Sequence, residues 1–188
     1  MNWNVEGLIT AFQYLNPNIW ADKDVIVLTE TFLTKDWCSQ HHYTIHSLAT
    51  QGQTGRPKGG ITILLKSWLC PFHILHETEC ILAIKTIATV IVAAYFQPEL
   101  EEQHLLNELS QAINKINKEE TVILAGDLNC RIDITQDKAA SVISYLENEG
   151  LSLINDRQEK TYICHNGSST IDLIFSNMKR LHLTGRKH

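Results

Sequence analysis

The stretch Thr121-Val-Ile-Leu-Ala-Gly-Asp-Leu-Asn129 contains both a buried strand and a polar strand end. Its first residues, up to Ala125, form a short apolar and β-branched run, which is typical of a strand covered on both faces. After Gly126 come two polar side chains, Asp127 and Asn129. A carboxylate is costly to bury alone, so this position indicates either a strand-end turn or a site with chemistry.

Further short runs on both sides of this stretch also predict strands. They are Asp24–Thr29, Gly60–Lys66, Ile81–Ile87, Thr89–Tyr95 and Thr170–Phe175, besides a short strand at the N-terminus. Only Ala88 separates two of these runs, which predicts a tight hairpin between them.

Longer runs with helical spacing of apolar residues lie between the predicted strands. One contains Leu8, Phe12 and Leu15, and the others cover Glu101–Lys118 and Ala139–Glu149, the last followed by a glycine where helices often end. Helices therefore alternate with single strands and with neighbouring strand pairs. This order predicts one layered α/β domain over residues 1–188, with mixed or antiparallel sheets.

Composition excludes several classes of protein. The 188 residues carry a formal net charge of −5, so the chain is no polycation that binds nucleic acid through bulk charge, although a local basic patch remains open. No apolar stretch approaches the roughly 18 residues of a membrane helix, and no signal-peptide pattern begins the chain. The 5 cysteines include no C-x-x-C pair, which favours a reducing, intracellular compartment over a disulfide framework or structural zinc site.

Acidic and amide side chains follow several of the predicted strands. Asn4 and Glu6 follow the N-terminal strand, Glu30 follows the next one, and Asp172 lies inside the last. Mg²⁺ prefers oxygen ligands and retains waters, so one or two carboxylates and a substrate phosphate suffice to bind it. The pattern predicts that Glu30, Asp127 and Asp172 share a divalent cation, with a turn or cap as the alternative for each acid by itself.

A series of short motifs, in order along the chain, resembles the endonuclease/exonuclease/phosphatase superfamily. The motifs are Asn4-Val-Glu-Gly-Leu8, Leu28-Thr-Glu-Thr31, Gly59-Gly-Ile61, Ala94-Tyr95, Gly126-Asp-Leu-Asn129 and Ser169-Thr-Ile-Asp-Leu173. The spelling is most similar to the endonuclease domains of non-LTR retrotransposons, especially from Ser168 to Phe175.

The resemblance implies a four-layer α/β sandwich, in which two packed mixed sheets are flanked by helices. It also implies metal-dependent hydrolysis of phosphodiesters or phosphomonoesters, in which a metal offsets charge at phosphorus and a carboxylate activates water. By motif, Glu30 would bind Mg²⁺, with Mn²⁺ as a substitute, Asn4 would help to hold the metal, and Glu6 would be an outer acidic neighbour.

The resemblance assigns catalytic roles to four further residues. Asp127 would orient or deprotonate the attacking water, and Asn129 would help to position that water or the phosphate. Tyr95 would donate its hydroxyl to a phosphate oxygen, with a residue at the edge of the core as the other interpretation. Asp172 would orient a catalytic histidine.

Contacts with substrate are expected from three residues in loops. Arg56 and Lys58 would touch a DNA backbone, although solvated loop charges are the other interpretation of both. Ser169 would contact phosphate or simply open the last strand.

The sequence departs from the superfamily pattern at its end. That pattern closes with a Ser-Asp-His motif, and neither His182 nor His188 stands in such a context. We therefore expect a C-terminally truncated domain without the final strands and the catalytic histidine. Its catalysis should be impaired, and Thr170–Phe175 should form an unpaired sheet edge.

The leading hypothesis is a Mg²⁺-dependent phosphodiesterase, most similar to a retrotransposon endonuclease that nicks DNA by metal-assisted attack of water. DNA would be its partner and the nucleus its place of action, with no membrane involved. The alternatives are an abasic-site nuclease or another phosphodiesterase of the superfamily, and a non-catalytic remnant.

Overall fold

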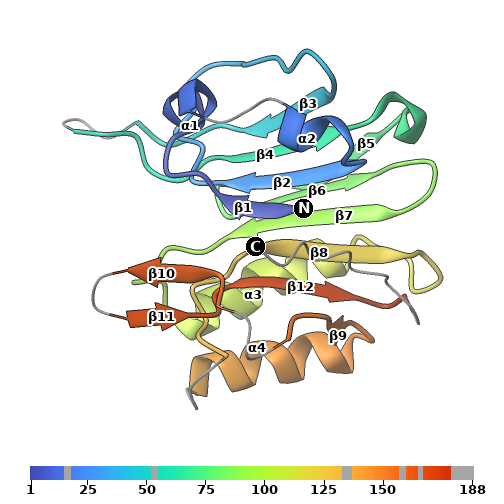
Figure 1. Cartoon of the computed structure of the whole chain (residues 1–188). Coiled ribbons are helices and arrows are strands. Elements are labelled where there is room, and N and C mark those ends of the chain that lie inside the picture. The colour runs from blue at the N-terminus through green and yellow to red at the C-terminus, as the bar shows by residue number, and fades with distance from the viewer. Residues whose placement is uncertain (15–17, 52–54, 133–136, 157–159, 165–166, 179–188) are drawn as a thin grey trace.

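The computed structural model describes residues 1–14, 18–51, 55–132, 137–156, 160–164 and 167–178. Two mixed sheets face each other, and helices cover their outer surfaces (Figure 1). No helix in these ranges is long and apolar enough to cross a membrane.

The smaller sheet is built from the N-terminal part of the chain. Its strands lie in the order β1, β2, β4, β3, with bounds Asn2–Asn4, Val25–Thr29, Ile61–Leu65 and Tyr43–Ser47. β1 runs parallel to β2, and the other pairs are antiparallel. Two short helices, α1 (Leu8–Tyr14) and α2 (Asn18–Ala21), lie over its outer face (Figure 1).

The larger sheet has the order β5, β6, β7, β8, β12, β9. Its strands span His73–Glu77, Ile81–Lys85, Val90–Tyr95, Val122–Asp127, Asp172–Ser176 and Ser152–Leu153. Only β7 and β8 pair in parallel within it, and the long helices α3 (Glu102–Ile113) and α4 (Asp137–Asn148) pack on its outer face. A separate hairpin consists of β10 (Tyr162–Cys164) and β11 (Gly167–Ser169), and a single 3₁₀ turn covers Ser67–Leu69.

Successive side chains along a strand point to opposite faces of its sheet, and this alternation produces the four layers. In β7, Ile91, Ala93 and Tyr95 face the smaller sheet, whereas Val90 and Val92 face the helices. Three apolar clusters result: one between the sheets, one under α3 and α4, and one under α1 and α2. This confirms the four-layer sandwich, because each sheet can bury both of its faces only in that arrangement.

Most of the predicted elements are confirmed. β2, β4, β6, β7 and β8 lie within or overlap the expected runs, and β6 and β7 form the expected antiparallel hairpin. α4 ends as expected, because Gly150 takes a positive φ of 84° and its N–H bonds to Glu147 O at 2.9 Å. For the first helix, Leu15 lies outside the described residues.

Helix α3 is shorter than predicted, since it ends at Ile113 instead of Lys118. Asn114 N–H still bonds four residues back, to Ser110 O, but the two N–H groups after it bond three residues back, Lys115 to Ala112 and Ile116 to Ile113. This tighter turn places Ile116 against the core formed under α3 and α4.

The predicted free edge at Thr170–Phe175 is wrong. The strand there begins at Asp172 and continues to Ser176, and it pairs with β8 on one side and β9 on the other. Beyond β9, the side chain of Asn155 takes the place of a neighbouring strand: its Oδ1 accepts from Ile174 N–H at 2.6 Å, and its Nδ2 donates to Asp172 O at 3.1 Å. The backbone groups of β12 are therefore satisfied on both sides.

Candidate active site

The residues that follow strands of both sheets meet at one end of the sandwich. Asn4 ends β1 and Glu30 follows β2 in the smaller sheet, while Tyr95 ends β7 and Asp127 ends β8 in the larger one. Gly126 makes the close approach of β8 to β7 possible, because a Cβ there would lie 1.8 Å from Ala94 O. This brings Asp127 level with Tyr95 in the parallel register.

Among the residues named here, two hydrogen bonds connect the sheets at this end. The Nδ2 of Asn4 donates to Asp127 Oδ2 at 2.9 Å, and the hydroxyl of Tyr95 donates to Glu30 Oε1 at 2.6 Å. Each bond pairs a group from the smaller sheet with a group from the larger one. The site is therefore assembled only when both sheets are packed together.

Asp127 is held from two directions. It is 1% exposed; Oδ2 accepts the amide of Asn4, and Oδ1 accepts the backbone N–H of Asn129 at 3.0 Å. Asn4 is itself fixed, because its Oδ1 accepts the backbone N–H of Glu6 at 3.2 Å. Burial raises the pKa of Asp127 to about 6, and the nearby charge of Glu30 adds to this, while the two hydrogen bonds oppose it.

Asp172 is the nearest partner of Asp127 in the antiparallel register of β12 and β8, at the first position of β12 and not inside it as predicted. Burial raises its pKa to about 7, and the charge of Asp127 contributes next. Within the described part of the chain its Oδ1 is buried without a hydrogen-bond partner. This end of the sandwich thus brings buried carboxyl groups close together.

Tyr95 is poised as a hydrogen-bond donor. Its pKa is raised by burial and by its hydrogen bond to Glu30, so the hydroxyl stays protonated at neutral pH. The bond joins Tyr95 to the carboxylate that the motif assigns to the metal, and it fixes the orientation of that carboxylate.

The donor set fits a hard divalent cation. Asn4 and Glu30 could contribute oxygens, and a nearby positive charge would stabilise the buried oxygen of Asp172, which has no hydrogen-bond partner among the described residues. In the described residues no group of three or more His, Cys, Asp or Glu side chains is arranged to hold a metal by itself. Such a set suits Mg²⁺, which takes one or two carboxylates and keeps its waters.

Glu6 and Asn129 occupy supporting positions. The Glu6 side chain is exposed, and its backbone supplies the contacts: the N–H donates to Asn4, and the carbonyl accepts from Arg56. The Nδ2 of Asn129 donates to Phe96 O at 2.7 Å, which ties the loop after β8 to the end of β7. Asn129 therefore lies beside Asp127, and its amide nitrogen is engaged by the backbone.

Backbone strain gathers around the site. Glu6, Glu30, Phe32 and Asn129 all adopt φ values between 45° and 52°. Asparagine tolerates this region, but each of the others costs on the order of 1–3 kcal/mol. Strain of this kind persists only where surrounding contacts determine the backbone, which is common at functional sites.

A groove of about 470 Å³ opens beside Glu30 and Tyr95. Arg56 and Lys58, both predicted substrate contacts, line it together with Phe32. Ser169 is not among the lining residues; it ends β11 and is 6% exposed, and its carbonyl accepts the Thr161 N–H. His182 and His188 lie outside the described residues.

Sequence reasoning missed Phe32 and Thr161. The Arg56 guanidinium lies over the ring of Phe32 in a cation–π contact, with Cζ 4.1 Å from the ring centroid. The hydroxyl of Thr161 accepts the N–H groups of Ile171 and Asp172, each at 3.1 Å. The only signal for Phe32 was its place two residues after Glu30, and nothing marked Thr161.

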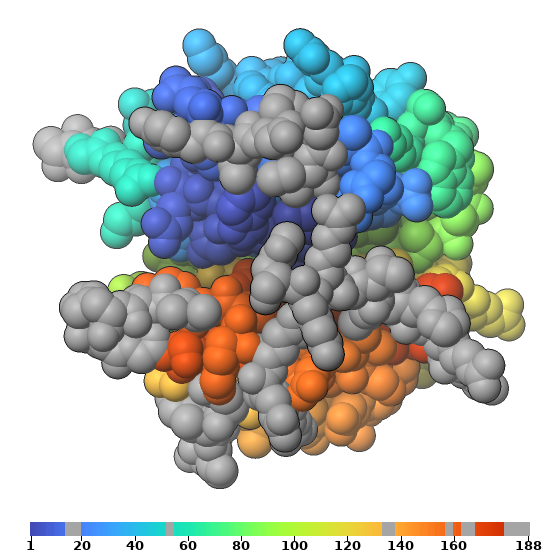
Figure 2. Space-filling model, viewed as in Figure 1, coloured from blue at the N-terminus to red at the C-terminus, as the bar shows by residue number. Residues whose placement is uncertain are grey.

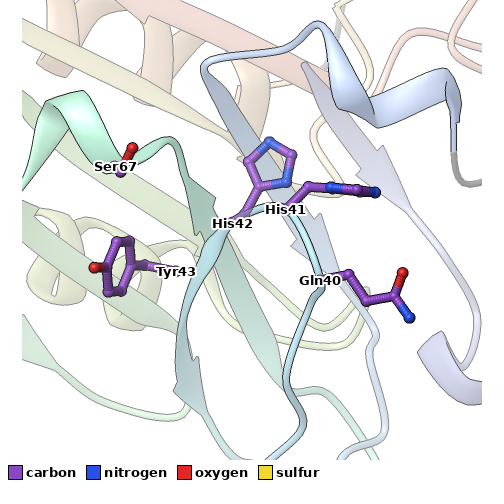
Figure 3. A pocket seen from close by; sticks show the side chains of 5 residues that line it. All are labelled: Gln40, His41, His42, Tyr43 and Ser67. Atoms are coloured by element: carbon purple, nitrogen blue, oxygen red, sulfur yellow. The ribbon is translucent and has the colours of Figure 1, made fainter.

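A second hollow lies away from this end, before β3. It is lined by Gln40, His41, His42, Tyr43 and Ser67, and Figure 3 shows their side chains pointing away from one another. His42 is engaged with a backbone carbonyl, that of Lys23, at 2.9 Å. These five side chains form no converging set, so we place the candidate site at the strand ends.

Comparisons with known proteins agree on the fold. The family described as endonuclease-reverse transcriptase matches residues 89–188. Among solved structures, the endonuclease domain of TRAS1, a telomere-specific non-LTR retrotransposon, has a TM-score of 0.68 at 14% identity, covering 93% of this chain and 82% of its own.

Two further structures have the same fold. An AP endonuclease from Archaeoglobus fulgidus has a TM-score of 0.72 at 11% identity, covering 94% of this chain and 85% of its own. An endonuclease/exonuclease/phosphatase family protein from Leptotrichia buccalis has a TM-score of 0.58 at 14% identity, covering 95% and 87%. No curated protein matches. With the family match over residues 89–188, the chain belongs to the endonuclease-reverse transcriptase family, within the endonuclease/exonuclease/phosphatase superfamily.

Proposed function

We propose that this chain is a Mg²⁺-dependent endonuclease of the non-LTR retrotransposon type, which nicks DNA by attack of water on a phosphodiester. The observation that carries the proposal is the pair of hydrogen bonds across the sheets, Asn4 to Asp127 and Tyr95 to Glu30. They bring a buried carboxylate, a fixed amide and a phenol donor to the same end of the sandwich, next to a groove lined by two basic side chains.

Asp127 is the general base in this proposal. Its pKa of about 6 suits a group that takes a proton from water near neutral pH. The bonds from Asn4 and from the Asn129 N–H hold both carboxylate oxygens, so little reorganisation is needed when water is deprotonated. Asp172, with one buried oxygen lacking a partner among the described residues, would accept a hydrogen bond from a histidine or a substrate donor.

Glu30 and Asn4 would hold the metal, and Glu6 would support them through its backbone. Bound Mg²⁺ would offset the negative charge that develops on phosphorus. Tyr95 keeps Glu30 oriented and, because it stays protonated, is also a donor for a phosphate oxygen.

Nicking of a supercoiled plasmid in Mg²⁺ tests the proposal. The Asp127→Asn variant keeps the shape of the side chain but removes the base, and we expect its rate to fall roughly 10²–10⁴-fold. Glu147→Gln on the exposed surface of α4 is the matched control, and it should nick at the wild-type rate. Equal nicking by wild type and Asp127→Asn would refute the assignment, and Mg²⁺ binding without any nicking would favour a non-catalytic protein.

An abasic-site nuclease is the second candidate, favoured by the fold similarity to the Archaeoglobus AP endonuclease. A duplex with one abasic site, compared with the same duplex intact, distinguishes the two. Cleavage confined to the abasic position would replace the retrotransposon-type proposal, whereas nicking of intact DNA supports it.

A further inference from the structure

We propose that Phe32 and Arg56 form a stacking subsite for an unpaired nucleobase of the DNA strand that enters the site. This inference rests on the proposed function, because the subsite adjoins Glu30 and Tyr95. It adds a substrate feature, an unpaired base, to the phosphodiester that those residues would act on.

Phe32 has a strained backbone conformation, and its ring lies in the groove. Its φ is 52°, a conformation that is a genuine outlier for a bulky side chain. The N–H of Phe32 donates to Gly59 O at 3.1 Å, which fixes the strained residue against the loop that carries Arg56. The ring is half-buried and lines the groove, so it does not serve as a core side chain.

Arg56 lies over this ring as a fixed, planar group. Its Cζ is 4.1 Å from the ring centroid, and its Nη2 donates to the carbonyl of Glu6. Gly7 leaves room for both, since a Cβ there would come within 3.3 Å of Arg56 Nη2 and of the Phe32 ring. The Arg56 side chain is otherwise exposed, so one face of the guanidinium is covered by the ring and the other is open to solvent.

An open guanidinium face backed by an aromatic ring is a surface on which unpaired bases stack. The adjoining groove, at about 470 Å³, is of the size that takes a small ligand, roughly 300–1,000 Å³. Pro57, Pro98 and Tyr95 add apolar walls, and Lys58 adds a positive charge for a backbone phosphate. Figures 1 and 2 show that the loop around residues 55–58 extends from the body. Arg56 and Lys58 are exposed there, so the loop is accessible to a ligand from solvent.

The charge balance favours stacking as the main source of affinity. The chain has a net charge of −5, and Glu30 and Glu99 line the same groove as Arg56 and Lys58. Phosphate contacts alone would therefore be few and would supply little affinity at physiological salt. Stacking on a base depends far less on salt and is available to any sequence.

Equilibrium binding in EDTA tests the subsite without catalysis. The probe is a single-stranded oligonucleotide with one 2-aminopurine, compared with the same strand in a full duplex. We expect wild type to prefer the single strand and to quench the 2-aminopurine. Phe32→Gly, which tolerates the backbone angle, and Arg56→Lys, which keeps the charge, should each weaken single-strand binding roughly 5- to 150-fold.

Two variants serve as controls. Phe32→Tyr keeps an aromatic ring and should bind within about twofold of wild type. Lys58→Gln should weaken binding to both probes alike and reduce the salt slope by about 0.7–0.9. Circular dichroism and cooperative unfolding show whether each variant is folded.

The subsite is overturned if folded Phe32→Gly and Phe32→Tyr bind the single strand equally, if wild type shows no preference for it, or if wild type binds neither probe. Because the assay contains no metal, it separates the two proposals. Stacking on the single strand without nicking in Mg²⁺ would support the subsite and contradict the nuclease proposal. Nicking in Mg²⁺, together with equal single-strand binding by wild type and Phe32→Gly, would support the nuclease proposal and contradict the subsite.

Discussion

Asp172 shows how a single buried carboxylate links the site to stability. Burial, and next the charge of Asp127, raise its pKa in the folded chain from the ordinary 3.8 to about 7. A carboxyl with a raised pKa stabilises the fold below its unfolded pKa, and that stability is lost as the pH rises through the folded pKa. The contribution is therefore present below about pH 4 and is lost between about pH 4 and pH 7.

Replacing this carboxyl by a neutral amide should remove the pH dependence that it causes. In metal-free buffer, Asp172→Asn should unfold with a free energy on the order of 2–4 kcal/mol above wild type at pH 8, and close to wild type at pH 4. Urea unfolding at both pH values measures this. An equal difference at the two pH values would contradict the pKa assignment, and Asp36→Asn at an exposed position is the control.

At the scale of elements, β12 depends on a side chain as well as on strands. Asn155 Oδ1 accepts the Ile174 N–H and its Nδ2 donates to Asp172 O, where β9 has already ended. This contact holds the strand that carries Asp172 into the site. Without this side chain the Ile174 N–H and the Asp172 carbonyl would lose these partners, which would lower the free energy of unfolding.

Asn155→Ala should lower the free energy of unfolding by about 1–3 kcal/mol, since it leaves the Ile174 N–H without a partner. Ser152→Ala, which is exposed and keeps the backbone pairing of β9, should stay within about 0.5 kcal/mol of wild type. Chemical denaturation of the three proteins gives the comparison. If Asn155→Ala unfolds like Ser152→Ala, the edge of β12 is protected in some other way.

The elements also show what could be predicted from sequence and what could not. β4, β6 and β7 are buried on both faces, so their apolar runs were sufficient to locate them. β3 and β5 were missed because they lie at sheet edges and carry polar side chains such as His46 and Glu77. β9 to β11 are too short to produce a pattern.

At the scale of the whole molecule, the site depends on the packing of two sheets. Asn4 and Asp127 are more than a hundred residues apart in sequence, yet they share a hydrogen bond of 2.9 Å. Their motifs located these residues along the chain, but only the sandwich defines which of them touch. The sequence could not locate Phe32, because a positive φ at a bulky residue is set by the surrounding tertiary contacts.

The central claim is that the two sheets together form one catalytic centre, in which Glu30 binds the metal and Asp127 deprotonates the attacking water. The most direct test is the rate of DNA nicking as a function of Mg²⁺ concentration, for wild type, Glu30→Gln and Asp127→Asn. Glu30→Gln should need on the order of 10–100-fold more Mg²⁺ for half-maximal rate. Asp127→Asn should keep the wild-type Mg²⁺ dependence with a plateau lower by roughly 10²–10⁴-fold. A wild-type protein that nicks equally well in EDTA, or two variants with the same profile, would contradict the claim.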